Sequence, residues 1–165
     1  TLSGSVTIKS KPGLGTDFIL KIPLTLAIIE GMMVKIGSGM YIIPLANIVE
    51  CIEFHPETDD VEKVCSHINA RGELLPYINM RKWFEFDNEE KPESQQVVIV
   101  HDQDSKMGIV VDKVIGNHQT VIKPLGELYK NVEGLSGATI LGDSSVALIL
   151  DVFKLSSVIR KVQVN

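Results

Sequence analysis

Short alternations of apolar and polar residues, separated by turn residues, run along most of this chain. Val6-Thr-Ile-Lys alternates, and Lys11-Pro-Gly-Leu-Gly15 then supplies turn residues before Asp17–Ile22, a second and more apolar strand. Glycine accepts positive φ and proline fixes φ in a tight turn, so this segment predicts a β-hairpin. The same kind of pattern recurs downstream with little helical periodicity. The chain is therefore predicted to be all-β.

Further strands are predicted up to residue 150. They cover 26–35, 40–43, 50–54, 64–69, 74–78, 97–100, 107–111, 121–123, 138–141 and 146–150. The charged stretch Glu85–Gln96 contains a proline and predicts a linker. Apolar residues at helical spacing between Val152 and Val162 predict a short amphipathic C-terminal helix.

Two stretches of the chain resemble each other and indicate an internal repeat. Met40-Tyr-Ile-Ile-Pro-Leu-Ala-Asn-Ile-Val is matched by Met107-Gly-Ile-Val-Val-Asp-Lys-Val-Ile, 107 − 40 = 67 positions later. Ile78-Asn79-Met80 is matched by Leu150-Asp151-Val152, with 151 − 79 = 72 between Asn79 and Asp151. A repeat of this length indicates two copies of a small β domain. We expect two SH3-like barrels in tandem, the first at about 26–88 plus the C-terminal segment and the second at about 95–150.

Composition excludes several classes of function. The chain has 16 Lys and Arg against 21 Asp and Glu, for a net charge of −5. Nucleic-acid binding needs a basic face, and Arg occurs only at positions 71, 81 and 160. Apolar runs are too short to span a bilayer, so no direct membrane insertion is expected. Cys51 and Cys65 have no zinc spacing, and we expect buried free thiols.

Candidate chemistry is sparse. His101, Asp102 and Asp104 share a predicted turn without metal-ligand spacing, so a solvated turn is favoured over a metal site. His118 follows Gly116-Asn117 and is interpreted as a turn residue. The Lys11–Thr16 loop lacks the Gly-Lys-Ser/Thr ending of a phosphate-binding loop and precedes a strand. We therefore predict no catalytic, cofactor-binding or metal-binding residue.

Apolar residues near turns are more informative. Core burial is the usual place for them, and partner contact is the alternative, because exposed apolar clusters often mark interfaces. For partner contact we select strand and turn residues of each barrel. They are Ile43, Glu53 and Leu74 in the first barrel, and Tyr129, Val132 and Leu135 in the second.

Several segments resemble a known family. Gly134–Val152 resembles the closing hairpin of a CheW-like domain, in the version found at the C-terminus of CheA-type chemotaxis histidine kinases. Leu74–Met80 and Met107–Gly116 are similar to the same family, and Gly4–Ala27 resembles the last hairpin of the GHKL ATP-binding kinase domain. This suggests a kinase-derived segment at 1–25 and a CheW-like regulatory domain at 26–165. A first residue other than Met also predicts a piece of a longer protein.

The resemblance implies two intertwined SH3-like barrels around a pseudo-twofold axis. It implies a regulatory scaffold that docks the adaptor CheW and the cytoplasmic tips of chemoreceptors, coupling receptor state to kinase activity in two-component signalling. The expected location is cytoplasmic, in receptor arrays, through these partners.

Departures from the kinase pattern limit what the resemblance implies for catalysis. The glycine boxes of the ATP lid, the magnesium-binding Asn and the phospho-accepting His domain are not among these residues. Thr16 would lie near nucleotide only in the intact kinase, where ATP and Mg²⁺ are the cofactors. This chain alone is expected not to be an enzyme. The alternatives are a free-standing CheW-like adaptor, a fragment with partial ATP-dependent kinase function, and a barrel that binds nucleic acid.

Overall fold

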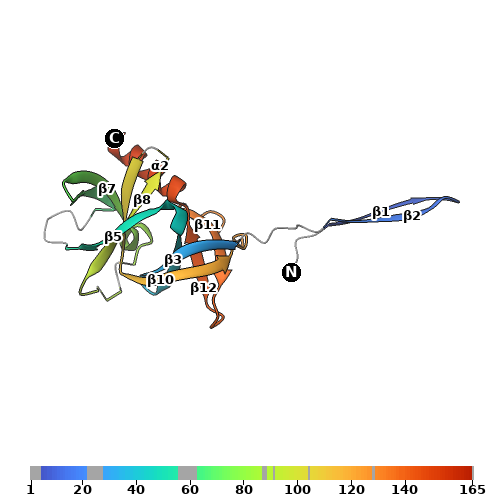
Figure 1. The fold of residues 1–165 in the computed structure, drawn as a ribbon, viewed down its shortest axis with the longest axis horizontal. Helices are drawn as coiled ribbons and strands as arrows, with labels where there is room; N and C mark the ends of the chain where they lie inside the picture. The colour runs from blue at the N-terminus through green and yellow to red at the C-terminus, as the bar shows by residue number, and fades with distance from the viewer. Residues whose placement is uncertain are drawn as a thin grey trace.

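Two five-stranded sheets form the body of the computed structural model, and a two-stranded hairpin precedes them (Figure 1). The structure describes residues 5–21, 28–55, 63–86, 89–90, 92–103, 105–127 and 129–164. The strands are β1 (Ser5–Lys11), β2 (Gly15–Lys21), β3 (Ile28–Ile36), β4 (Gly39–Pro44), β5 (Ile48–Phe54), β6 (Cys65–Ala70), β7 (Glu73–Asn79), β8 (Gln95–Asp102), β9 (Ser105–Val111), β10 (Lys113–Val121), β11 (Leu135–Ile140) and β12 (Val146–Leu150). The helices are the 3₁₀ turn η1 (Leu45–Asn47), α1 (Met80–Trp83) and α2 (Val152–Val164). The predicted all-β fold with a short C-terminal helix is confirmed.

The two repeats are interleaved in the sheets. We call β3–β7 with α1 the first repeat and β8–β12 with α2 the second. Sheet I has the order β10-β3-β4-β12-β11, and sheet II has the order β5-β8-β9-β7-β6. Each sheet therefore takes its second and third strands from one repeat and the other three from the other repeat. The expected barrel ranges 26–88 and 95–150 do not match this order, because β3 and β4 join the strands of the second repeat.

The pairing registers fix which positions of the two repeats are equivalent. Ile36 pairs with Gly39 across the β3–β4 turn, and Asp102 pairs with Ser105 across the β8–β9 turn, an offset of 102 − 36 = 66. The counterpart of Met40 is thus Lys106, one residue away from the Met107 that the sequence match suggested. A shift of one residue matters because successive side chains of a strand point to opposite faces.

The same offset holds for the third strand of each repeat. A break in the pairing register leaves Val49 unpaired in β5 and Ile115 unpaired in β10, and these two positions are also 115 − 49 = 66 apart. Both bulged residues are apolar and exposed. Bulges at matching positions indicate that the pseudo-twofold relation extends to local irregularities of the strands.

The closing hairpins end in helices that start in the same way. The Asn79 side chain accepts hydrogen bonds from the backbone N–H groups of Arg81 and Lys82 at the start of α1. Asp151 Oδ1 accepts from the N–H of Lys154 at 3.1 Å in the first turn of α2. A short polar side chain at this position satisfies N–H groups that have no partner inside the helix. The sequence match between Asn79 and Asp151 therefore reflects a shared capping role.

Helix α2 is anchored to the end of β8 by a buried carboxylate. Asp102 Oδ2 accepts from Ser156 Oγ and from Arg160 Nη2, both at 2.6 Å. Asp102 is 6% exposed, so its predicted place in a solvated turn is wrong. Three apolar side chains of α2 are buried, namely Val152, Leu155 and Ile159.

One apolar core joins the two sheets. Val34 and Tyr41 of sheet I belong to the same buried cluster as Val98 and Ile109 of sheet II, and Leu155 of α2 completes it. Sheet I also closes on itself, because Lys123 and Ala138 exchange backbone hydrogen bonds of 2.8 and 3.0 Å. This shared cluster is the largest buried one, and each sheet also has a smaller cluster of its own. They are Ile42, Ala147 and Ile149 in sheet I, and Phe54, Ala70, Leu75, Tyr77, Val97, Ile99 and Val110 in sheet II.

The N-terminal hairpin has one apolar face with no cover among the described residues. Every residue of β1 and β2 is exposed. Val6 pairs directly with Leu20, and Ile8 pairs with Phe18, so these four side chains share one face of the hairpin. Figure 1 shows the hairpin extending away from the body. The predicted hairpin is confirmed.

A methyl group at Gly31 is expected to destabilise the sheet I barrel. Gly31 lies in β3 opposite Pro44, and an added Cβ would clash with the Ile42 side chain and lie 3.1 Å from the Ile43 carbonyl oxygen. Gly31→Ala is expected to lower the free energy of unfolding by about 1–3 kcal/mol, as overpacking does. Urea unfolding measures this, with Gly142→Ala, where a Cβ meets nothing within 4 Å, as the control. Equal stabilities of the two variants would contradict the packing described here.

Candidate docking surfaces

The six predicted partner-binding residues are divided between surface and core. Leu74 and Tyr129 are 68% and 42% exposed, and Glu53 is exposed on β5. Val132 is half-buried against the main core. The structure leaves open whether any of these four contacts a partner, and that part stays a prediction.

Ile43 and Leu135 are core residues, which corrects the expectation that they lie on a surface. Their side chains are 0% and 1% exposed. Ile43 ends the run Tyr41-Ile42-Ile43, and all three of these residues are buried. A strand that is covered on both faces loses the alternation from which an outward position is inferred.

Each barrel exposes apolar side chains on its closing hairpin. Leu74 in β7 and Val146 in β12 are 146 − 74 = 72 positions apart, the offset that also relates Asn79 to Asp151. Val146 is 53% exposed and pairs directly with Ile140, which is 55% exposed. Val146 and Ile140 were missed from the sequence alone, although adding the repeat offset to Leu74 would have found Val146. The two barrels thus expose apolar side chains at equivalent positions of their closing hairpins.

Tyr129 lies close to the buried Tyr41, whose ring stacks on the half-buried Phe84. The rings of Tyr41 and Phe84 are parallel within 15°, with their centroids 5.0 Å apart. Burial, followed by the nearby Tyr129 and Glu89, raises the pKa of Tyr41 to about 12. The Tyr41 phenol is therefore neutral at physiological pH.

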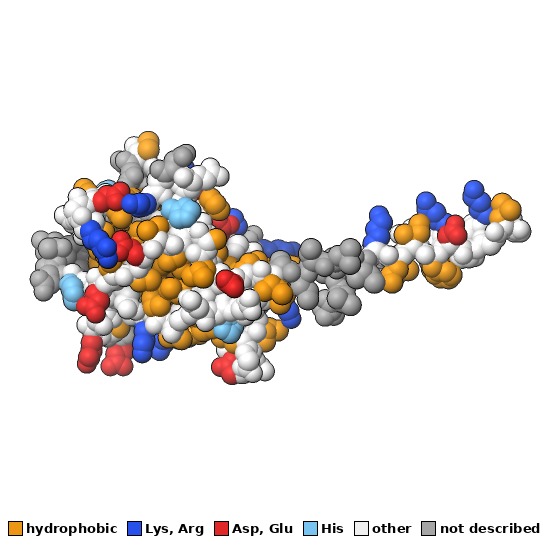
Figure 2. All heavy atoms as spheres, in the orientation of Figure 1, with side chains coloured by type: hydrophobic (Ala, Val, Ile, Leu, Met, Phe, Trp, Pro, Cys, Tyr) orange, Lys and Arg blue, Asp and Glu red, His pale blue; other side chains and the backbone are white. Residues whose placement is uncertain are grey.

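An apolar hollow lies where β3 begins and β4 passes into η1. It has a volume of about 490 Å³ and is lined by Ile29, Glu30, Pro44, Leu45 and Ala46. We call these five residues the apolar hollow. In Figure 2, hydrophobic atoms gather in the middle of the face on which Figure 1 shows β3, β5 and β10. The two sheets contact each other between β5 and β3, where Cys51 Sγ donates to Met32 Sδ at 3.6 Å.

The 3₁₀ turn η1 forms one wall of the apolar hollow, and hydrogen bonds to sheet II hold η1 in place. His101 Nε2 hydrogen-bonds to the Ala46 carbonyl at 3.1 Å, and Asn47 Nδ2 donates to the His101 carbonyl at 3.2 Å. These two bonds join η1 to the end of β8. The shape of the hollow therefore depends on contacts between the two sheets.

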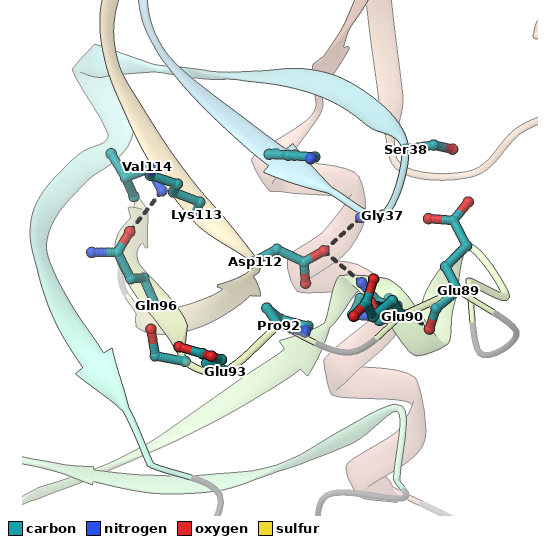
Figure 3. Close-up of a pocket in the computed structure, with 13 residues that line it drawn as sticks. Gly37, Ser38, Glu89, Glu90, Pro92, Glu93, Gln96, Asp112, Lys113 and Val114 are labelled. Atoms are coloured by element: carbon teal, nitrogen blue, oxygen red, sulfur yellow. Dashed lines mark hydrogen bonds and ion pairs between the residues drawn. The ribbon is translucent and has the colours of Figure 1, made fainter.

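A second hollow, which we call the polar hollow, lies where β9 passes into β10. It has a volume of about 820 Å³, and its lining includes Lys35, Gln96 and Lys113 with the carboxylates of Glu90 and Glu93. Figure 3 shows Gln96, Lys113, Glu90 and Glu93 arranged around Asp112.

Asp112 is the centre of a buried hydrogen-bond network in the polar hollow. Its Oδ2 accepts from the Gly37 N–H at 2.7 Å (Figure 3) and from Arg81 Nη1 at 2.6 Å. Its Oδ1 accepts from Gln95 Nε2. The side chains of Arg81 and Asp112 are each 8% exposed. The other terminal nitrogen of Arg81 donates to the carbonyls of three connecting residues, Phe86, Glu89 and Glu90. The predicted linker is thus held in place by Arg81, a contact with no signal in the sequence.

The structure gives no functional role to the other residues considered in the sequence. Thr16 lies in β2, exposed, with its hydroxyl 3.0 Å from that of Ser10. Over the described ranges, no three His, Cys, Asp or Glu side chains come together in a way that could hold a metal ion; Asp104 lies outside these ranges. Cys51 and Cys65 are free thiols, but Cys51 is exposed and Cys65 is half-buried, so the prediction that both are buried is wrong. Among the helices that the structure describes, none is long and apolar enough to cross a membrane.

Comparisons with known proteins agree with this architecture. The family model of the CheW-like domain matches residues 30–160. In solved structures, the scaffolding protein TtCheW from Thermoanaerobacter tengcongensis superposes with a TM-score of 0.62 at 20% identity, over 75% of this chain and 89% of that protein. The predicted pair of SH3-like barrels is confirmed by this fold.

Curated relatives are chemotaxis proteins of much greater length. The chain is 37% identical over 164 residues to chemotaxis protein CheA of Salmonella typhimurium, covering 97% of this chain and 24% of that protein. It is 36% identical over 165 residues to the sensor histidine kinase CheAY of Helicobacter pylori, covering 99% of this chain and 20% of that protein. The chain thus spans about a quarter or less of the length of these relatives. Because the family model covers most of its residues, this chain belongs to the CheW-like domain family.

Proposed function

We propose that this chain is the docking domain of a chemotaxis histidine kinase. It binds a CheW-type scaffolding protein and the cytoplasmic tips of chemoreceptors, and so couples receptor state to kinase activity. It acts by contact rather than by catalysis and uses no cofactor itself, whereas ATP and Mg²⁺ serve the kinase domain. It works on the cytoplasmic side of the membrane, held in receptor arrays by its partners.

The observation that carries this proposal is the matched exposure of apolar side chains on the two closing hairpins. Leu74 is exposed at the end of one barrel, and the paired residues Val146 and Ile140 are exposed at the end of the other. A module with two related ends can contact two neighbours at once, which suits a scaffold. Apolar side chains that are more than half exposed favour partner contact because their burial releases free energy.

The N-terminal hairpin supports a kinase rather than a free-standing adaptor as the parent protein. Its four apolar residues, Val6, Ile8, Phe18 and Leu20, are each at least 60% exposed. A two-stranded hairpin alone is marginally stable in water, so it needs a surface to pack against. We propose that residues 1–25 belong to a preceding ATP-binding domain, which covers this face.

Substitutions at the barrel ends test the docking proposal. Leu74→Asp and Val146→Asp each place a charge in an apolar contact and are expected to weaken binding of the CheW-type protein about tenfold, or about 1.4 kcal/mol. Calorimetric titration measures the affinity. Leu14→Asp is the matched control, because Leu14 is 83% exposed but lies in the turn of the hairpin. Unchanged affinity in both barrel-end variants would rule out these surfaces as the docking sites.

A further inference from the structure

Two lysines face each other on the lining of the polar hollow. Lys35 of β3 and Lys113 of β10 are direct partners in the antiparallel register, and both are exposed. Side chains that are directly opposite each other in such a pair lie on the same face of the sheet and interact. Like charges at these positions repel each other and destabilise the pair. An anion between the two ammonium groups would remove this repulsion.

The chain does not supply that anion from its own side chains. In the part of the chain that the structure describes, neither Lys35 nor Lys113 forms an ion pair. The buried carboxylate of the hollow, Asp112, is paired with Arg81 at 2.6 Å, and its oxygens accept two further hydrogen bonds from the chain. The charge of Asp112 is thus already compensated, and the two lysines keep theirs.

The equivalent corner of the other repeat is closed by hydrogen bonds within the chain. With the offset of 101 − 35 = 66 and 113 − 47 = 66, Lys35 corresponds to His101 and Lys113 corresponds to Asn47. There Asn47 Nδ2 donates to the His101 carbonyl at 3.2 Å, and His101 Nε2 hydrogen-bonds to the Ala46 carbonyl at 3.1 Å. The fold therefore forms this corner without two like charges in one repeat, and the opposed lysines are a feature of the polar hollow alone.

Gln96 adds a neutral donor to the same lining. Its Oε1 accepts from the Val114 N–H at 2.6 Å, which fixes the side-chain amide (Figure 3). Over the described residues, no group of the chain accepts a hydrogen bond from its Nε2. Two ammonium groups and one amide thus remain available to the oxygens of a ligand.

The carboxylates on the lining restrict which anion fits. Glu90 and Glu93 are exposed there, and Glu89 is half-buried. An extended polyanion in a hollow of about 820 Å³ would approach these carboxylates and be repelled. A compact anion held between the lysines keeps its charge beside two cations.

We propose that the polar hollow binds one phosphate group between Lys35 and Lys113, with Gln96 as the third donor. The phosphate is free or is the monoester of a small molecule. Lysine binds phosphate as a point charge, and a phosphate monoester carries a charge of about −1.5 to −2 at pH 7, which balances the two ammonium groups. This binding site is separate from partner docking and does not depend on it.

Titration of the full chain with inorganic phosphate tests the site. At constant ionic strength, we expect amide shifts centred on Lys35, Lys113 and Gln96 and a Kd of about 1 mM. Lys35→Gln and Lys113→Gln are each expected to weaken binding at least fivefold, because each removes one of the two charges. Lys106→Gln is the matched control, since Lys106 is also a strand lysine but is paired with Glu73 at 2.9 Å, and it is expected to change affinity less than twofold.

Thermal unfolding gives a second readout of the same pair. Without phosphate, Lys35→Gln and Lys113→Gln are each expected to raise the melting temperature, because the repulsion between the lysines is lost. Added phosphate is expected to raise the melting temperature of the wild-type chain more than that of either variant, since only the wild-type chain has the complete site. A fall in melting temperature in both variants without phosphate would show that the lysines do not repel each other and would contradict the proposal.

Two further anions define the ligand class. Methyl phosphate that binds as tightly as inorganic phosphate would identify the ligand as a monoester, whereas binding of inorganic phosphate alone would identify free phosphate. Tripolyphosphate is expected to bind no more tightly than phosphate. Equal shifts at the hairpin residue Lys9, or unchanged affinity in both Lys35→Gln and Lys113→Gln, would mean that phosphate only screens surface charge, and the site would be ruled out.

Discussion

Cutting the chain between its repeats is expected to unfold both pieces. Residues 1–94 supply β5, β6 and β7 to sheet II but lack β8 and β9, which lie between β5 and β7. Residues 95–165 supply β10, β11 and β12 to sheet I but lack β3 and β4, which lie between β10 and β12. The shared core is divided as well. Each piece alone is expected to give the poorly dispersed amide spectrum of an unfolded chain, and mixing the two should restore the native spectrum.

Removal of the N-terminal hairpin is the matched control for this cut. A chain that starts at residue 26 keeps both sheets and loses only β1 and β2, whose residues are all exposed. Its melting temperature and its spectrum are expected to match those of the full chain. Independent, monomeric folding of either half would contradict the interleaved topology, because it would require a barrel built from one repeat.

Loss of the Arg81 side chain is expected to cause the largest destabilisation among single substitutions at ion pairs. Arg81→Ala leaves the buried Asp112 carboxylate without its cation and removes the donor to three backbone carbonyls. Breaking a buried pair in this way costs about 3–5 kcal/mol, because an uncompensated charge remains inside. Urea unfolding followed by circular dichroism at neutral pH measures the difference.

An exposed ion pair provides the comparison for Arg81. Arg71 Nη2 lies 2.9 Å from Glu50 Oε2, with the Arg71 side chain 78% exposed. Arg71→Ala is expected to cost about 0–1 kcal/mol, since an exposed pair gains little over its hydration. Similar losses in the two variants would mean that the Arg81 pair does not hold the junction between the sheets.

Local patterns predicted most of the secondary structure. The hairpin at residues 5–21 and the helix from Val152 follow from alternation, turn residues and helical spacing, each of which acts over a few residues. The prediction that His118 lies in a turn is wrong. It was based on Gly116-Asn117, which precede His118 and are typical turn residues. Gly116 instead follows the bulge of β10 with φ of +147°, and the strand continues through His118.

The arrangement of strands in the sheets was not predictable from these patterns. The alternation in β3 and β4 is the same whether they pair with their own repeat or with the other one, so the sequence match suggested two consecutive barrels. The contact between Arg81 and Asp112 joins residues with no shared motif. Leu74 was found because it stands out as an apolar residue beside a turn, whereas Lys35 and Lys113 became candidates only when the strand register placed them opposite each other.

The most direct test of the docking function is a calorimetric titration of the folded chain with the CheW-type scaffolding protein of the same organism. We expect saturable binding with a Kd of about 1 μM, which corresponds to about −8 kcal/mol. Absence of binding at about 100 μM, with a dispersed amide spectrum that shows the chain to be folded, would contradict the docking role proposed for this domain.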